Sequence, residues 1–133
     1  MTRPPTSDPE SEGSGPNARG RRGEAEAAVF LERHGYRIVA RNLRTREGEL
    51  DLLVRRHRLY AAVEVKTRRH HPAPEQAVTA AQLARLERAL VRLARVLRPR
   101  PRRLRVDVVA VRWTASEPTE VRHFPGQPFA PPT

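Results

Sequence analysis

The sequence predicts an α/β domain with a mixed sheet flanked by helices, in the order helix, three strands, helix, strand. Apolar residues recur at helical spacing over residues 22–34 and 76–97. In the segments between and after these helices they alternate with polar residues, as in half-buried strands. Three consecutive strands favour an antiparallel meander, and the last strand would join the sheet after a helical crossover.

Each predicted helix has an apolar stripe and a signal that ends it. The helix over 22–34 has Ala25, Ala28 and Val29 on its stripe and stops before Gly35. The helix over 76–97 repeats leucine at spacings of three and four, at Leu83, Leu86, Leu90, Leu93 and Leu97. A proline-rich run at 98–103 then breaks the chain.

Four strands are predicted, at residues 36–44, 49–56, 59–68 and 104–113. Residues 45–48 end in glycine and form a turn between the first two strands. Strict alternation in the second strand puts Leu50, Leu52 and Val54 on one face and Glu49, Asp51 and Leu53 on the other. Asp51 is thus a carboxylate in an otherwise apolar strand, where an unpaired charge is costly.

The length and the ends of the chain predict one domain with two tails. The chain has 133 residues, which fits a single domain over 20–113. Residues 1–19 are rich in Pro, Ser, Gly and Glu and are predicted to be disordered, and 114–133 read as a proline-rich C-terminal tail. No apolar window is long enough to span a bilayer or to form a secretory signal. We therefore expect a soluble, cytoplasmic protein.

Basic residues are concentrated in the predicted domain. The net charge is +11, yet each tail is net −1, so residues 20–113 hold 23 of the 26 Lys and Arg but only 10 of the 15 Asp and Glu. A small domain with this excess attracts polyanions, and nucleic acid is the first candidate. The alternatives are an arginine-rich genome that raises basic residues everywhere, and a ribosome-associated or membrane-surface protein.

The chain has one lysine, Lys66, among its 26 basic residues, two positions after Glu64 in the third strand. If residues 56–57 form a two-residue turn, Asp51 and Glu64 become diagonal neighbours on one face, within about 8 Å of each other. Lys66 shares that face. A slip of one residue would send Glu64 to the opposite face, so only one parity of pairing gathers the three side chains.

Two carboxylates on one face of a basic domain suit a divalent cation. Adjacent anions repel unless a cation lies between them, and ligand sets made of oxygen favour Mg²⁺ or Mn²⁺. Such an ion polarises a phosphate and lowers the pKa of a bound water, and Lys66 could orient that water. The alternative is a Glu-x-Lys pair on a solvated strand face.

These residues also resemble a known family. The run "GEAEAAVFLERHGYRIVARNLRTREGELDLLV", followed by "VEVKTR" and "VDVVAV", resembles the YraN family of uncharacterised bacterial proteins over residues 20–111. That family is similar to Holliday-junction resolvases and belongs to the restriction-endonuclease-like, PD-(D/E)xK superfamily. The resemblance implies an α-β-β-β-α-β nuclease core with a divalent-metal site.

Carried over by position, the resemblance assigns a role to each residue of the site. It implies metal ligation by Asp51, Glu64 and the Val65 carbonyl, and service to the attacking water by Lys66. Glu24 matches an acidic residue that resolvase-like proteins place near the metal. A first-turn position beside the helix dipole would explain Glu24 equally well.

Contacts to nucleic acid are expected from Arg68, Arg69, Gln82 and Arg85. Gln82 stands where the family often has a phosphate-facing lysine. Arg85 belongs to a helical stripe, with Arg88, Arg92 and Arg95, that is either a solvated face or a ridge for phosphates.

The sequence thus predicts a Mg²⁺- or Mn²⁺-dependent nuclease acting on structured or branched DNA. The alternative is a non-catalytic nucleic-acid-binding or adaptor protein that keeps the fold. Cleavage of a symmetric junction would call for a two-fold homodimer.

Overall fold

The computed structural model of the chain describes residues 16–69, 78–114 and 117–133. Within these ranges lie two helices, α2 (Pro16–Arg33) and α3 (Ala80–Leu93). The strands are β1 (Arg37–Thr45), β2 (Gly48–Arg56), β3 (Leu59–Arg68), β4 (Arg103–Thr114) and β5 (Glu117–Phe124). This order confirms the predicted α/β core and adds β5 after it.

The strands form one mixed sheet in the order β1-β2-β3-β4-β5. The first three pair antiparallel, as the predicted meander requires. After α3 crosses over, β4 pairs parallel with β3, and β5 returns antiparallel to β4. The crossover is needed because parallel neighbours cannot be joined by a tight turn.

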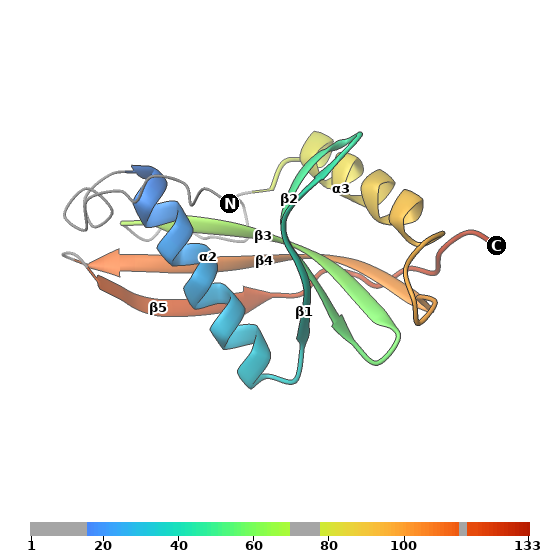
Figure 1. Cartoon of the computed structure of the whole chain (residues 1–133). Helices are drawn as coiled ribbons and strands as arrows, with labels where there is room; N and C mark the ends of the chain where they lie inside the picture. Colours follow the sequence, from blue (N-terminus) through green and yellow to red (C-terminus); the bar gives the residue numbers. More distant parts are fainter. Residues whose placement is uncertain (1–15, 70–77, 115–116) are drawn as a thin grey trace, which may run out of the picture.

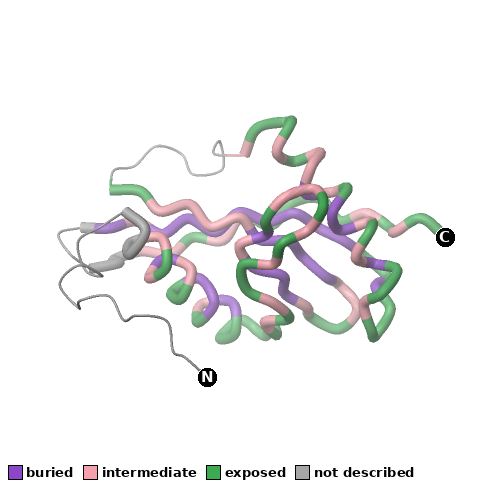
Figure 2. Tube along the Cα trace, turned by 45° about the horizontal axis from the view of Figure 1, so that its top comes forward, coloured by how far each residue is buried: buried purple, intermediate pink, exposed green. Residues whose placement is uncertain are grey.

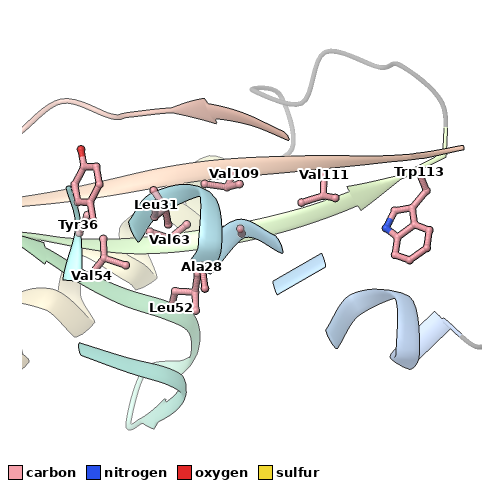
Figure 3. Close-up of a cluster of buried hydrophobic side chains, with 11 residues drawn as sticks. Ala28, Leu31, Tyr36, Leu52, Val54, Val63, Val109, Val111 and Trp113 are labelled. Carbon is pink, nitrogen blue, oxygen red and sulfur yellow. The ribbon is translucent and has the colours of Figure 1, made fainter. Parts of the chain in front are cut away.

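The two helices cover opposite faces of the sheet, which gives three layers (Figure 1). On the α2 side, Ala28 and Leu31 pack on strand residues that include Leu52 and Val109, as Figure 3 shows. The α3-side core contains Leu53, Tyr60, Ala62, Leu86, Leu90 and Leu104. The central strands therefore bury residues on both faces, whereas exposed segments gather in turns and on the outer helix surfaces (Figure 2). Neither described helix is long and apolar enough to cross a membrane.

α3 begins at Ala80, later than predicted. Thr79 caps it, because its backbone is extended and its Oγ1 accepts a hydrogen bond of 3.1 Å from the Gln82 amide. Residues 76–77 of the predicted helix lie outside the described residues. The cap fixes the first turn of α3, which carries Gln82, beside β3.

The pairing of β2 with β3 differs from the predicted register. The turn consists of His57 and Arg58, one residue later than expected, and His57 has a φ of 55°, as two-residue hairpin turns require. The prediction was therefore wrong by two residues but right in parity. Continued by one pair, the observed register sets Asp51 directly opposite Glu64.

The predicted proline-rich tail over 114–133 is wrong, because this segment contributes β5 and a bridge between Phe129 and Leu104. Val121 packs against the α2-side core and Phe129 against the α3-side core. Proline is tolerated here because β5 is an edge strand, where not every backbone donor is needed for pairing.

The predicted disordered N-terminal tail is also too long. Residues 16–19, which it included, belong to α2, so the folded domain starts before residue 20. Residues 1–15 lie outside the described residues.

Candidate metal centre where β2 and β3 separate

The candidate site lies where β2 leaves β3. Their pairing ends at Leu52 and Val63. At the preceding residue of β2, the Asp51 side chain replaces the backbone pairing. Its Oδ2 accepts a hydrogen bond of 2.8 Å from the Val65 amide. A strand residue presents its N–H and C=O to the same side, so the Val65 carbonyl also projects toward Asp51.

β2 departs from strict alternation at this same point. Leu52 belongs to the α2-side core, but Leu50 packs in the α3-side core. The prediction that both leucines share a face is therefore wrong. The chain rotates between them, which it can do because β2 is no longer paired with β3 there. Asp51 is the residue at this rotation.

Glu64 is held by donors from two elements. Gln82 Nε2, from the first turn of α3, donates a hydrogen bond of 2.8 Å to Glu64 Oε2. Lys66 Nζ lies 3.2 Å from the same oxygen, and the Lys66 and Glu64 side chains are 19% and 12% exposed. Glu64 and Lys66 therefore share a face, as the strand pattern predicted, and Gln82 faces the same site.

α2 brings a third carboxylate, Glu24, close to these strands. Gly23 allows this approach, because a Cβ at that position would lie 2.8 Å from Thr67 Oγ1 of β3. Asn42 of β1, with a φ of 49°, hydrogen-bonds the Glu24 side chain. The first turn of α2 contains no acidic residue, so a favourable dipole at the start of the helix does not account for Glu24.

Burial and repulsion from nearby carboxylates raise the pKa values of Asp51 and Glu24. Burial raises the pKa of Asp51 most, a backbone hydrogen bond opposes this, and Glu64, Glu24 and Glu49 add to the rise, giving a pKa of about 6. Burial also raises the pKa of Glu24, with a smaller contribution from Glu49 and Glu64. The acids thus form a local excess of negative charge that a bound cation would relieve.

The donors at this site suit Mg²⁺ or Mn²⁺, which prefer hard oxygen ligands. Among the described residues, Asp51 Oδ1 and Glu64 Oε1 have no hydrogen-bond partner, so each is available to ligate. Within the same ranges, no group of three or more His, Asp or Glu side chains is arranged to hold a metal. The candidate set is therefore two carboxylates and the Val65 carbonyl completed by water, as is common for Mg²⁺.

The arginines predicted to contact nucleic acid occupy two different settings. Arg68 and Arg69 are exposed at the end of β3, beyond Lys66. Arg85 instead reaches the β1–β2 turn, where its NH1 donates to the carbonyls of Glu47 and Glu49 at 3.3 and 3.5 Å. Arg85 is thus partly engaged by the protein, and only its remaining N–H groups can reach a ligand.

A second member of the helical arginine stripe is engaged as well. Arg92 binds the Glu47 carboxylate through Nε and NH2, at 2.9 and 2.8 Å from Oε2. Two of the four arginines therefore hold α3 to the β1–β2 turn. The stripe does not present a continuous ridge for phosphates.

Sequence reasoning missed the roles of Gly23, Thr67 and Asn42 in placing Glu24. The sequence does carry a signal for two of them. A glycine inside a helix often marks close packing, and an asparagine inside a strand is unfavourable unless it has a local function. Thr67 gives no comparable signal, because threonine is common in strands.

Comparison with known proteins identifies the family. The sequence profile of the uncharacterised protein family UPF0102 matches residues 23–111. The chain belongs to this family. A UPF0102 protein of Leifsonia xyli is 43% identical over 109 residues, covering 80% of this chain and 92% of that protein. One from Syntrophotalea carbinolica is 46% identical over 112 residues, covering 80% of this chain and 88% of that protein. The UPF0102 match spans all the acids of the candidate site.

Among solved structures, the chain is similar to Pyrococcus furiosus SfsA in complex with Ca²⁺. The TM-score is 0.36 at 15% identity, and the match covers 82% of this chain and 63% of that one. A likeness this weak supports no argument about the function of this UPF0102 protein.

Proposed function

We propose that the protein is a divalent-metal-dependent nuclease that hydrolyses phosphodiester bonds of nucleic acid, with branched or otherwise structured DNA as its substrate. The observation that carries this proposal is the placement of Asp51 beside Val65 and Glu64 where β2 and β3 separate. The resemblance of these motifs to resolvase-like nucleases supports the reaction, and the basic domain supports a polyanionic substrate. Such a substrate would place the protein in the cytoplasm.

In this proposal Asp51, Glu64 and the Val65 carbonyl hold Mg²⁺ or Mn²⁺. The bound ion would supply positive charge that polarises the phosphate and makes water a better nucleophile at neutral pH. Asp51 must lose its proton to act as a ligand, and its pKa of about 6 means that it does so across the weakly acidic range.

Lys66 orients the attacking water and neutralises charge that develops on the phosphate. Its ammonium is 3.2 Å from Glu64, so it lies beside the proposed ligands. As the water oxygen bonds to phosphorus it releases a proton to solvent, the opposite P–O bond breaks, and the leaving oxygen takes up a proton from solvent. Arginine would serve less well here, because its guanidinium is larger and planar. Gln82 holds Glu64 in place through its 2.8 Å hydrogen bond.

The test is cleavage of labelled DNA by the purified full-length protein. A four-way junction and a linear duplex of matching sequence are incubated with Mn²⁺, and with EDTA as the control. We expect cleavage that requires metal and favours the junction. Asp51→Ala and Glu64→Ala should each slow it by about 100-fold or more, because a bound ion contributes several kcal/mol of transition-state stabilisation.

α2 supplies a matched pair of control variants. Glu24 lies beside the site, whereas Glu26 is exposed on the same helix. Glu24→Gln should slow cleavage and Glu26→Gln should leave it unchanged. Absence of cleavage with every divalent metal, or cleavage that survives Glu64→Ala, refutes the nuclease proposal. DNA binding without cleavage would instead support a non-catalytic nucleic-acid-binding protein.

A further inference from the structure

A basic surface lies at the end of the sheet opposite the acids, where both helices end. It is formed by six arginines, Arg37, Arg55, Arg56, Arg100, Arg102 and Arg103, and is called the basic end below. The residues at this end of the sheet, 33–38, 54–60 and 98–104, contain no Asp or Glu. The fold thus separates an acidic site at one end from uncompensated positive charge at the other.

Part of the basic end is a pocket of about 390 Å³ lined by Gly35, Arg37, Arg55, Arg56 and His57. Arg37 and Arg55 face each other directly across β1 and β2. Like charges in this position destabilise a sheet. Among the described residues, no carboxylate pairs with either guanidinium. A bound anion would remove this repulsion.

The α3–β4 loop is fixed against the β2–β3 turn by hydrogen bonds to Arg58. The Arg102 amide donates to the Arg58 carbonyl at 2.8 Å, and Arg58 Nε donates to the Arg100 carbonyl at 2.6 Å. Tyr60 Oη adds a bond of 2.7 Å to the Pro99 carbonyl. The β2–β3 turn and this loop therefore lie side by side (Figure 1). This places the arginines of the turn and those of the loop at the same end of the sheet.

Contacts within the protein engage only some arginines at this end. Arg56 donates to the His34 carbonyl at 3.2 Å and Arg98 to the Leu97 carbonyl at 2.7 Å, both beyond the last residues of α2 and α3. Arg37 lies on a strand, and within the described chain no hydrogen bond or ion pair engages the guanidinium of Arg102. Arg37 and Arg102 are both exposed, so their guanidinium groups can bind a ligand from solution.

We propose that the basic end binds the phosphate backbone of duplex nucleic acid. Guanidinium groups match phosphate oxygens in geometry, and several gathered at one end of a sheet favour a polyanion over a single small ion. From Leu59 to Glu64, β3 rises about 17 Å, close to half the 34 Å turn of B-DNA. The distance from the basic end to Glu64 therefore lies within the length of one duplex turn. Its relevance to cleavage rests on the proposed nuclease function, whereas binding at the basic end does not.

The test measures binding of a short labelled DNA duplex in EDTA by fluorescence anisotropy across a salt titration. The variant is Arg37→Gln/Arg55→Gln, and the charge-matched control is Arg88→Gln/Arg95→Gln, two exposed positions on and just after α3. We expect the first variant to lose about tenfold or more in affinity and about 2 units of the log–log salt slope, since each phosphate contact contributes about 0.9. The control should lose less than about threefold.

Equal losses in the two double variants, or no loss in either, would overturn this proposal. So would wild-type protein that binds anionic lipid vesicles but not duplex. If Arg37→Gln/Arg55→Gln fails to fold by circular dichroism, Arg100→Gln/Arg102→Gln in the loop must show the same loss. Wild-type protein that binds duplex through the basic end yet never cleaves DNA would refute the nuclease function alone and support this inference.

Discussion

Gln82 Nε2 donates a hydrogen bond of 2.8 Å to Glu64 Oε2, and Lys66 Nζ lies 3.2 Å from the same oxygen. α3 thereby presents a neutral donor where the resemblance leads us to expect a lysine. Gln82→Lys would add one positive charge beside the proposed phosphate position. We expect tighter DNA binding and a salt slope steeper by about 1 in EDTA, because one more counterion is released.

Gln82→Met is the matched control for that prediction, since it removes the hydrogen bond without adding charge. Its salt slope should equal that of the wild type. If Gln82→Lys also leaves the slope unchanged, position 82 does not approach phosphate, and the proposed orientation of DNA at the site is wrong.

Asp51 should make metal binding depend on pH. Its pKa is about 6 in the folded protein against 3.8 ordinarily, so between these values the folded state holds the extra proton and stability falls as pH rises. A bound ion reverses this penalty only once Asp51 is deprotonated. At pH values well above 6, Mn²⁺ should therefore raise the melting temperature of the protein. Near pH 5 it should change the melting temperature hardly at all.

Asp51→Asn is the control variant for this pH dependence, because it removes the charge of the side chain but keeps its shape. Without metal, this variant should be more stable than wild type near pH 8 by on the order of 1 kcal/mol, after allowance for solvent screening. It should show no stabilisation by Mn²⁺ at any pH. Equal Mn²⁺ stabilisation of variant and wild type would remove Asp51 from the metal site.

The order of elements could be predicted from the sequence because each element has its own periodicity. The leucine stripe predicted α3, and the alternation of apolar and polar residues predicted the meander and β4. Alternation also gave the parity that puts Glu64 and Lys66 on one face. The register was out by two residues, because an Arg-His-Arg run offers no glycine or asparagine to locate the turn.

Other features depend on contacts that no local pattern encodes. Leu50 packs in the α3-side core and not in the α2-side core because β2 separates from β3 at this point. The tertiary structure decides where the two strands separate. Glu24 could be placed at the site only through the family resemblance, since the packing of α2 on β3 decides its position. β5 was hidden because the proline-rich segment around it is typical of a tail, although an edge strand tolerates proline.

Two glycines of α2 should respond in opposite ways to alanine. A Cβ at Gly23 would lie 2.8 Å from Thr67 Oγ1, whereas a Cβ at Gly20 would have no atom of the described residues within 4 Å. Gly20→Ala should stabilise the protein by about 0.5–1 kcal/mol through helix propensity. Gly23→Ala should not be stabilised in this way, because its Cβ would meet Thr67 and displace Glu24. Gly23→Ala/Thr67→Ala should recover the stability, because the second change removes the Thr67 hydroxyl. Urea unfolding measures all three, and equal stabilisation by the two single variants would contradict the close approach.

A buried ion pair on the α2 side of the sheet links β4 to β5 and to Tyr36. Asp107 is fully buried and bound twice by Arg105, at 2.7 and 2.8 Å. His123 of β5 lies 2.7 Å from Asp107 Oδ2, and Arg105 also donates to Tyr36 Oη at 2.8 Å. Burial alone would raise the pKa of Asp107, but the hydrogen bonds from His123 and Arg105 lower it below its usual value.

Removing one partner of this pair should be far more costly than removing both. Asp107→Ala leaves Arg105 charged and buried, so we expect a loss of about 3–5 kcal/mol in urea unfolding. Arg105→Met/Asp107→Leu should be clearly milder, because no buried charge is left unpaired. Since the folded pKa of Asp107 is depressed, its contribution is present above the ordinary value of 3.8 and lost as pH falls further. Wild type should therefore lose stability in that acidic range more steeply than the double variant, and parallel pH profiles would show that Asp107 is not the group responsible.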